Sequence, residues 1–350
     1  MKTKAPSIRD VAAAAGVSTA TVSRALSSPD KVSAPTRDAV FRAIEQTGYR
    51  LNIAARNLRK RETGAVAVLV PNLANPFFSA ILSGIAAVMS EAGYNVLVTD
   101  TTPFGRGDGV TGHQFPAFAN ARHVDGLIVL DGLLPAEALD SLGPPQIRPP
   151  TVYACEWSEL VDRPRVTIDN VAAGQGAVEH LVALGHSKIG HLCGPPENVL
   201  TRERLKGAQA ALAAAGLAMA PGWVYPGDFS LESGARAADA WCAAPDRPTA
   251  VFCASDVMAI GFIGALMRRG VKVPAEVSVI GFDDLDMASH FVPALTTVRQ
   301  PRPEIGQSAA RLLLERMDLS PATRAASPGP RLVLPTELVV RETTAPPPVG

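Results

Sequence analysis

The segment "RDVAAAAGVSTATVSRAL", residues 9–26, contains two short helical patterns separated by one Gly-Val-Ser step. Apolar residues recur at helical spacing on both sides of this step. Ser7 can cap the first helix, and Gly16 suits the left-handed residue that ends it. Ser18 can then cap the second helix, which is expected to run to Leu26. The segment therefore predicts two helices joined by a very tight turn.

The second helix is expected to bury Val22, Ala25 and Leu26 and to leave small polar residues on its outer face. A third helix is expected between Ser33 and Gly48, with Val40, Phe41 and Ile44 facing inward. Two helices around such a turn are typical of a helix-turn-helix, in which the second helix can enter the major groove of DNA. Residues 1–48 are therefore expected to form a DNA-binding domain. A helical hairpin used only for packing is the alternative.

The charge of the chain is distributed unevenly, although its formal net charge is zero. Residues 1–61 hold twelve Lys or Arg against four Asp or Glu, a balance of +8, so the remainder carries −8. A basic head on an acidic body favours a polyanion as partner of the head alone.

From Ala65 onward, strand-like apolar runs alternate with helical patterns in two successive series. This alternation is typical of parallel sheets covered by helices. The expected fold class is therefore α/β, with an N-terminal helix-turn-helix head and a core of two similar lobes that enclose a cleft.

The stretch "SIRDVAAAAGVSTATVSRALSSPDKVSAPTRDAVFRAIEQTGYRLNIAARNLRK" resembles the DNA-binding head of the lac and galactose repressor (LacI/GalR) family. The resemblance continues from about residue 7 to 342 through "NPFF", "IDN", "GHSKIGHLCGP", "RERLKG", "PTAVFCASDVMAIG", "VSVIGFDD" and "LTTVRQP". It implies an effector-responsive, sequence-specific transcriptional regulator, most simply a repressor. Its core would be a two-lobed, type I periplasmic-binding-protein-like fold.

The resemblance also implies a domain plan. A hinge helix and linker are expected at residues 49–64, and an effector-binding and dimerisation core at residues 65–342. The first lobe is expected to comprise about residues 65–163 and 294–325, and the second about residues 164–293 and 326–342. The composition of "APPPVG" predicts a disordered tail at residues 343–350.

In this family the hinge helix places a leucine from each subunit in the minor groove of the operator, and Leu58 matches that position. A short basic helix with one exposed leucine also suits the kinking of a base step. Because paired hinge helices require symmetry, the expected partners are a second copy of the chain and a pseudo-palindromic operator in double-stranded DNA. The expected DNA-binding residues are Ser7, Thr19, Ala20, Thr21, Ser23, Arg24, Ser27, Asn52, Ala55, Arg56 and Leu58.

Residues that follow the predicted strands are the candidate effector ligands, because open parallel sheets bind ligands beyond the carboxyl ends of their strands. Aromatic rings, carboxylates and guanidinium groups together suit a sugar or a nucleoside. Within the family, "VYACEW", "VTIDN" and "RQPRPEIG" resemble the cytidine-responsive branch, which favours a nucleoside or a pentose. The candidates, which match effector-contacting positions of the family, are Asn75, Phe77, Phe78, Arg202, Arg204, Phe229, Asp256 and Asp283.

Catalytic, cofactor and metal motifs are not found in the sequence. The six histidines form no H-E-x-x-H pattern, no G-x-S-x-G elbow occurs, and the four cysteines form no C-x-x-C pair. Gly174 and Gly176 lie in a predicted helix, where close packing explains them better than phosphate binding. We therefore expect a protein that is not an enzyme and needs neither cofactor nor metal.

The N-terminus has no apolar signal core and no apolar run reaches about 18 residues, so the expected location is the cytoplasm, in association with the nucleoid, with no membrane partner. A cytoplasmic carbohydrate-binding protein without operator-specific regulation is the second hypothesis. The sequence leaves open the effector, the operator, the direction of the effector's action on DNA binding, and the choice between dimer and tetramer.

Overall fold

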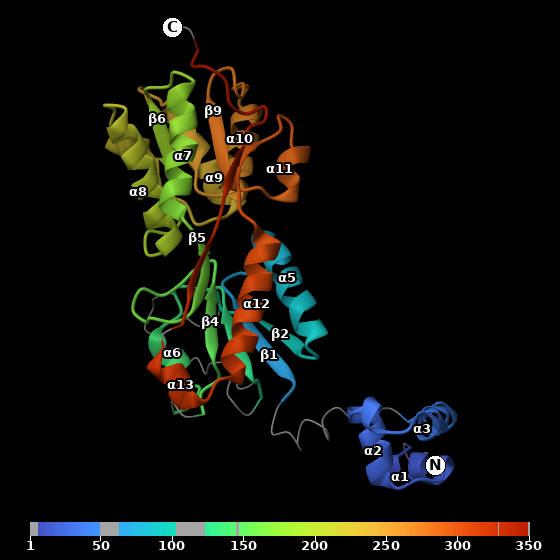
Figure 1. The fold of residues 1–350 in the computed structure, drawn as a ribbon. Coiled ribbons are helices and arrows are strands. Elements are labelled where there is room, and N and C mark those ends of the chain that lie inside the picture. The colour runs from blue at the N-terminus through green and yellow to red at the C-terminus, as the bar shows by residue number, and fades with distance from the viewer. Residues whose placement is uncertain (1–5, 50–62, 103–122, 145–146, 328, 349–350) are drawn as a thin grey trace. The chain divides into compact units, whose positions relative to one another are not determined.

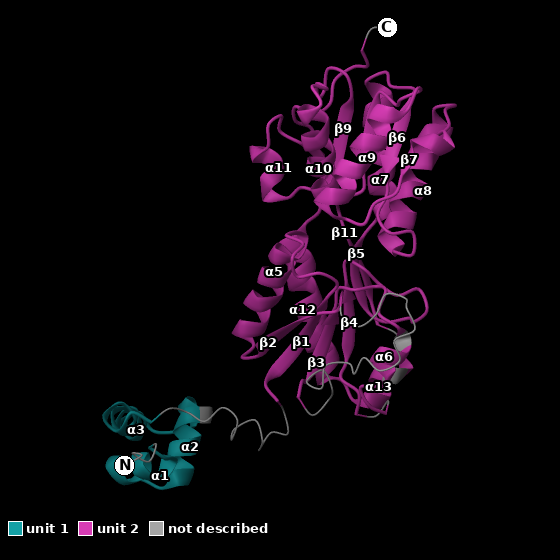
Figure 2. Ribbon diagram, turned by 180° about the vertical axis from the view of Figure 1, so that it is seen from behind, with its two compact units in different colours: residues 1–62 teal, residues 63–350 magenta. Residues whose placement is uncertain are grey.

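The computed structural model describes residues 6–49, 63–102, 123–144, 147–327 and 329–348. The chain divides into two compact units, Met1–Glu62 and Thr63–Gly350 (Figure 2). The first is called the head and the second the core. The expected hinge helix lies outside the described residues, and so do the expected DNA contacts Asn52, Ala55, Arg56 and Leu58.

The described part of the head, residues 6–49, contains the expected three helices, α1 (Ile8–Ala15), α2 (Thr19–Ser27) and α3 (Ala34–Thr47), and a 3-10 turn at Pro29–Lys31. At the start of α1, the main-chain N–H of Ser7 donates to the Asp10 carboxylate at 2.7 Å. Gly16 ends the helix in the left-handed region with a φ of 64°. Ser18 then accepts a hydrogen bond from the N–H of Thr21 at 3.1 Å and so caps α2.

Small apolar side chains form the centre of the head. Val11, Val22 and Val40 are fully buried there, and the side chains of Ala25 and Ala43 fill the space between the helices. Phe41 was expected to face inward, but 42% of its surface is exposed. It follows Val40 by one residue, about 100° further round the helix, and this step takes it off the buried stripe.

The core contains two six-stranded sheets, each covered by helices (Figure 1). The first sheet has the order β11-β5-β4-β3-β1-β2 and is parallel throughout. The second has the order β12-β10-β9-β8-β6-β7, and only β12 runs antiparallel to its neighbour. The strands of the first sheet are β1 (Ala65–Val70), β2 (Asn95–Asp100), β3 (Gly126–Val129), β4 (Thr151–Ala154), β5 (Arg165–Ile168) and β11 (Arg331–Leu334). Those of the second are β6 (Ile189–Leu192), β7 (Val224–Tyr225), β8 (Ala250–Cys253), β9 (Ser278–Asp283), β10 (Thr296–Arg299) and β12 (Glu337–Val339).

The helices divide between the two sheets in the same way. The first lobe has α5 (Phe77–Glu91), α6 (Ala136–Asp140), α12 (Arg302–Asp318) and α13 (Pro321–Ala326). The second lobe has α7 (Asn170–Ala183), α8 (Val199–Ala214), α9 (Leu231–Ala243), α10 (Asp256–Arg268) and α11 (Asp286–His290), with a 3-10 turn at Pro221–Trp223. Within the described residues, none of these helices is both long enough and apolar enough to cross a membrane.

The described chain crosses between the lobes after β5, after β10 and between β11 and β12. The expected lobe boundaries are therefore wrong by one strand at each crossing. β5 and β11 were assigned to the second lobe but pair in the first sheet, whereas β10 was assigned to the first lobe but pairs in the second. The apolar pattern of a four-residue strand shows that it is buried, and the sheet edge available for pairing decides which lobe receives it.

Within residues 343–348, the described part of the expected disordered tail, the chain makes ordered contacts with the core, which corrects the expectation there. Thr343 is fully buried and its hydroxyl donates to the carbonyl of Val279 at 2.7 Å. The main-chain N–H of Ala345 donates to the hydroxyl of Ser278 at 3.0 Å. The segment continues along β9 and pairs polar groups there, a contact that its proline-rich composition does not indicate.

Close helix packing depends on one of the two glycines in α7. A Cβ on Gly174 would lie 2.6 Å from the carbonyl oxygen of Arg204 in α8, whereas a Cβ on Gly176 would meet nothing within 4 Å. The packing explanation is therefore right for Gly174 and wrong for Gly176. Gly174 therefore allows the backbones of α7 and α8 to approach each other closely at Arg204.

We expect Gly174→Ala to lower the free energy of unfolding by about 1–3 kcal/mol, because the added methyl group meets a main-chain oxygen that cannot rotate away. Gly176→Ala in the same helix is the control, and it should be neutral or stabilising by roughly 0.5–1 kcal/mol. Urea denaturation of both variants measures the difference. Equal effects at the two positions would contradict the role assigned to Gly174.

Candidate functional site

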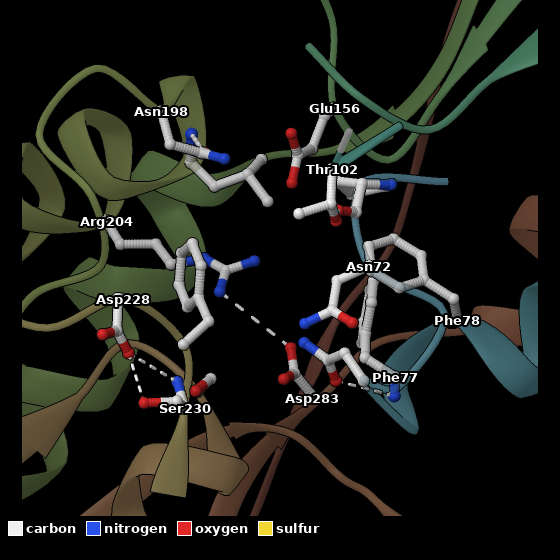
Figure 3. A pocket seen from close by; sticks show the side chains of 15 residues that line it. Asn72, Phe77, Phe78, Thr102, Glu156, Asn198, Arg204, Asp228, Ser230 and Asp283 are labelled. Atoms are coloured by element: carbon white, nitrogen blue, oxygen red, sulfur yellow. Dashed lines mark hydrogen bonds and ion pairs between the residues drawn. The ribbon is translucent and has the colours of Figure 1, made fainter. Parts of the chain in front are cut away.

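A pocket of about 150 Å³ lies between the two lobes of the core (Figure 3). Its walls come from segments that follow the carboxyl ends of strands in both sheets, as expected for open parallel sheets. The first lobe contributes Pro71, Asn72, Asn75, Phe77, Phe78, Thr102 and Glu156. The second lobe contributes Asn198, Leu200, Arg204, Asp228, Phe229, Ser230, Ser255 and Asp283.

Arg204 is a buried cation on the second-lobe wall, with only 2% of its surface exposed. Its Nε donates to the side-chain oxygen of Asn170 at 3.0 Å, and its Nη1 donates to the carbonyl of Ala254 at 2.6 Å. The guanidinium also lies 3.7 Å from the centroid of the Phe282 ring. These contacts fix a planar set of donors at the pocket before any ligand arrives.

Asp283 completes this charged group at the end of β9. Its Oδ1 lies 3.9 Å from Nη1 of Arg204 and accepts a hydrogen bond from the side chain of Gln300 at 2.8 Å. Burial raises the pKa of Asp283 to about 7 against the opposing attraction of Arg204. Because a guanidinium stays protonated at any ordinary pH, Asp283 is the partner of this pair that titrates.

Asp228 is a second carboxylate at the pocket, in a different electrostatic state. Burial alone would raise its pKa, but hydrogen bonds from Ser230, Ser233 and Arg236 outweigh that effect and hold the pKa below its usual value. The N–H of Ser230 donates to Oδ1 of Asp228 at 3.0 Å, and Nη2 of Arg236 donates to Oδ2 at 3.0 Å. The pocket therefore combines one carboxyl group that titrates near neutrality with one that stays ionised.

Aromatic rings line both sides of the pocket. Phe77 and Phe78 begin α5 in the first lobe, with ring centroids 5.0 Å apart in an edge-to-face arrangement. Asn75 accepts the N–H of Phe77 at 3.0 Å and so stabilises the turn that presents both rings. Phe229 lies on the second-lobe side with a φ of 64°, an uncommon value for a residue with a side chain.

Six of the eight expected effector residues line the pocket, namely Asn75, Phe77, Phe78, Arg204, Phe229 and Asp283. Arg202 does not, because it lies two residues from Arg204, about 200° round helix α8. Its guanidinium instead donates to the carbonyl of Glu197 and forms an ion pair with Glu159 at the surface.

Asp256 also lies outside the pocket, although it begins α10 shortly after β8 ends at Cys253. It is fully buried; its Oδ2 accepts the N–H of Leu285 at 2.8 Å and its Oδ1 accepts the hydroxyl of Thr297 at 2.6 Å. Burial raises its pKa to about 6. Its hydrogen bonds are internal: they hold the start of α11 through Leu285 and β10 through Thr297, and Asp256 is not among the residues that line the pocket.

Several lining residues were missed by the sequence analysis. Asn72, Thr102 and Glu156 follow β1, β2 and β4, so the rule that selected Asn75 would have selected them if it had been applied to every strand end. The others are Pro71, Asn198, Leu200, Asp228, Ser230 and Ser255. Ser255 has a local signal, since it caps α10 by accepting the N–H of Met258.

The outer face of α2 in the head carries the side chains expected to meet DNA. Thr19, Ala20 and Arg24 are exposed and Ser23 is half-buried. These residues border a surface hollow that also includes the basic residues Arg9 and Lys31. The hydroxyl of Thr21 shares a hydrogen bond at 2.9 Å with Ser18, the cap of α2, and the hydroxyl of Ser7, the cap of α1, donates to Asp10 at 2.7 Å. The side chain of Ser27 lies outside what the structure describes.

A helix-turn-helix head joined to a two-lobed core with a pocket between the lobes is the architecture of a ligand-controlled DNA-binding regulator. Residues 7–52 match the model of the bacterial regulatory proteins of the lacI family, and residues 178–344 match that of the periplasmic binding protein-like domain. The chain is 39% identical over 340 residues to the HTH-type transcriptional repressor CytR of Escherichia coli (strain K12), covering 97% of this chain and 96% of that protein.

Solved structures give the same result over the whole chain. A complex of the transcriptional regulator CelR with cellobiose matches at 35% identity with a TM-score of 0.70, covering 97% of this chain and 100% of that one. The lac repressor dimer bound to operator and the anti-inducer ONPF matches at 30% identity with a TM-score of 0.82, covering 98% and 100%. The chain belongs to the lacI family of bacterial regulatory proteins. It is a DNA-binding transcriptional repressor with an effector-binding, periplasmic-binding-protein-like core, and it is not an enzyme.

The raised pKa of Asp283 has a defined consequence for stability. Between the unfolded pKa near 4 and the folded pKa of about 7, the folded protein holds a proton that the unfolded chain has lost. This group therefore lowers the free energy of unfolding as the pH rises through that interval. We expect Asp283→Asn to become more stable relative to the wild type between pH 5 and pH 7.5, measured by urea denaturation at each pH. A stability difference that does not change with pH would show that Asp283 is ionised throughout.

Proposed function

We propose that the interlobe pocket binds a sugar or a nucleoside and that its occupancy changes the affinity of the head for its operator. One observation carries this proposal, which is the joint lining of the pocket by both lobes. Phe77 and Phe78 of the first lobe offer ring faces, while Arg204, Asp228 and Asp283 of the second offer charged partners for hydroxyl groups. The related CelR was solved with a sugar, cellobiose, which supports this class of effector.

Control of DNA binding requires that the effector distinguish two arrangements of the lobes, because a ligand shifts an equilibrium only by its difference in affinity for the two states. A ligand that touches the rings of α5 and the charges of β9 and α8 meets this condition. A rotation of one lobe against the other would break contacts on one side of the pocket. The three crossings between the lobes are the places where such a rotation would be accommodated.

We also propose that the protein acts as a homodimer on a pseudo-palindromic operator in the cytoplasm. A single helix-turn-helix reads few base pairs, so two copies related by a two-fold axis are required for operator specificity. The edge strand β2 exposes Leu97 and Val98, apolar side chains that suit a contact between subunits. The related lac repressor was solved as a dimer on its operator. Leu58 as a minor-groove wedge remains a prediction from the sequence.

The α2 face should supply phosphate or base-edge contacts through Arg24. We expect Arg24→Gln to weaken operator binding and to reduce the slope of log affinity against log salt concentration by about one unit, which corresponds to one lost phosphate contact. Arg42→Gln, the same charge change on α3, is the control and should keep the wild-type slope. The measurement is a gel-shift titration at several salt concentrations. A wild-type affinity that did not change with salt would contradict this placement of the DNA contacts.

The pocket assignment is tested by a pair of variants on the second lobe. A thermal-shift screen of sugars and nucleosides first identifies a ligand that raises the melting temperature. We expect Asp283→Asn to weaken binding of that ligand by about tenfold or more, because it removes a charged hydrogen-bond partner. Operator titrations should show that the same variant has lost the effector response.

Arg202→Gln is the control, since Arg202 lies on α8, the helix that carries Arg204, but outside the pocket. It should bind the ligand and respond to it as the wild type does. Operator binding without ligand reports whether each variant is folded. If Arg202→Gln loses the response and Asp283→Asn keeps it, the effector occupies a different site.

A further inference from the structure

A second cavity, of about 450 Å³, lies in the first lobe at the amino ends of β4 and β5. Its lining comes from the segments that enter these two strands, from the last turns of α12 and from α13. The pocket between the lobes, called the effector pocket from here on, lies at the opposite, carboxyl ends of the strands, since Glu156 follows β4 there. The two cavities share no lining residue. The second cavity is called the arginine pocket below.

Four arginines are among the residues that line the arginine pocket, namely Arg148, Arg163, Arg316 and Arg324. The carboxylate in its lining is Asp162, which is paired with Arg331 at 2.7 Å. Asp140 lies beside the pocket and pairs with two of the four, Arg148 and Arg163, the latter at 3.8 Å. The described structure shows no carboxylate partner for the other two, so positive charge is in excess here.

The guanidinium groups are held in place by main-chain carbonyls. Nε of Arg148 donates to the carbonyl of Gly143 at 3.1 Å. Nη2 of Arg316 donates to the carbonyls of Arg324 and Ser327, at 3.0 Å each, and Nη1 of Arg324 donates to that of Leu319 at 2.8 Å. A ligand would therefore find donors already positioned, and ordering them would cost it little free energy.

Arg163 is the least satisfied member of the group. Its Nε is buried and has no hydrogen-bond partner within the described part of the chain. Burial lowers its pKa, and the positive charge of Arg148 lowers it further. The pKa of Arg324 is lowered in the same way, first by burial and then by Arg316. Both pairs of arginines therefore repel each other in partly buried surroundings, and an anion between them would relieve the repulsion.

We propose that the arginine pocket binds a small phosphate-bearing anion. Planar guanidinium groups match the oxygens of a phosphoryl group with paired, charge-assisted hydrogen bonds. A single guanidinium group can pair with both oxygens of a carboxylate. Four arginines around a cavity of this size therefore suit a ligand with more oxygens, such as a phosphate ester or a diphosphate. This site is independent of the effector pocket and takes a different chemical class of ligand.

Inorganic pyrophosphate is the probe, titrated into the full-length protein by calorimetry in a phosphate-free buffer whose ionic strength is held constant with chloride. We expect saturable binding with one site per chain. Ser327→Asp places a carboxylate in the pocket and keeps the main-chain carbonyl that Arg316 uses, so it should weaken binding about tenfold or more. Ser327→Asn introduces a side chain of nearly the same size as Asp but without the charge, so this variant should bind pyrophosphate as the wild type does.

A second pair of variants tests the arginines themselves. Arg163→Gln should weaken pyrophosphate binding by a similar factor, whereas Arg311→Gln, the same change on the exposed face of α12, should have no effect. Thermal melts of the ligand-free proteins show which variants are folded. Absence of saturable pyrophosphate binding in the wild type would overturn the proposal. Binding that is intact in Ser327→Asp but abolished in Arg24→Gln would also overturn it, because the site would then lie in the basic head.

DNA is the other phosphate-bearing candidate for this pocket, and operator titrations in phosphate-free buffer distinguish it. If the pocket serves a small anion, Ser327→Asp and Ser327→Asn should bind the operator equally well. A loss of operator affinity in Ser327→Asp alone, without any loss of pyrophosphate binding, would show that the arginines contact the DNA backbone and would overturn the assignment to a small ligand.

Discussion

The buried guanidinium of Arg204 is the interaction on which the effector pocket depends. It joins the start of α7 through Asn170, the end of β8 through Ala254, and the end of β9 through Asp283. Removing a cation from water is costly, and these hydrogen bonds with the stacked Phe282 ring offset that cost. Loss of a neutral partner such as Asn170 would leave a buried donor of the guanidinium without its hydrogen bond, at a cost of about 1–3 kcal/mol. The result is a set of fixed donors at the wall of the pocket.

Close packing and buried hydrogen bonds hold the elements around this cation in place. Gly174 lets α7 approach the carbonyl of Arg204 itself, and Asp256 joins the start of α11 to β10 through Leu285 and Thr297. Asp283, at the end of β9, has a positive φ of 123°. Strained backbone of this kind persists only where its surroundings impose it, and it is typical of binding sites.

The two charged sites of the core differ in how their charges are balanced. At the effector pocket, Arg204 faces Asp283, and a ligand with hydroxyl groups can exchange hydrogen bonds with both. At the arginine pocket, Arg316 and Arg324 bond to main-chain carbonyls in the described chain, so their charge is left for an anion. One site thus suits a neutral polar ligand and the other a charged one. They lie at opposite ends of the strands of the first sheet, on which both depend.

The sequence by itself determined the local elements and the class of the protein. Capping residues and the left-handed Gly16 specify the two helices of the head through contacts within a few residues, and such contacts can be read from sequence. The position of residues after strands identified Asn75, Phe77, Phe78, Arg204, Phe229 and Asp283 as pocket residues, because parallel strands bring their carboxyl ends together. The tertiary structure decided what depends on distant pairing. It assigned β5, β10 and β11 to their sheets, ordered Thr343 along β9, turned Arg202 to the surface and buried Asp256, since sheet edges, helix rotation and buried hydrogen-bond partners involve residues far apart in the chain.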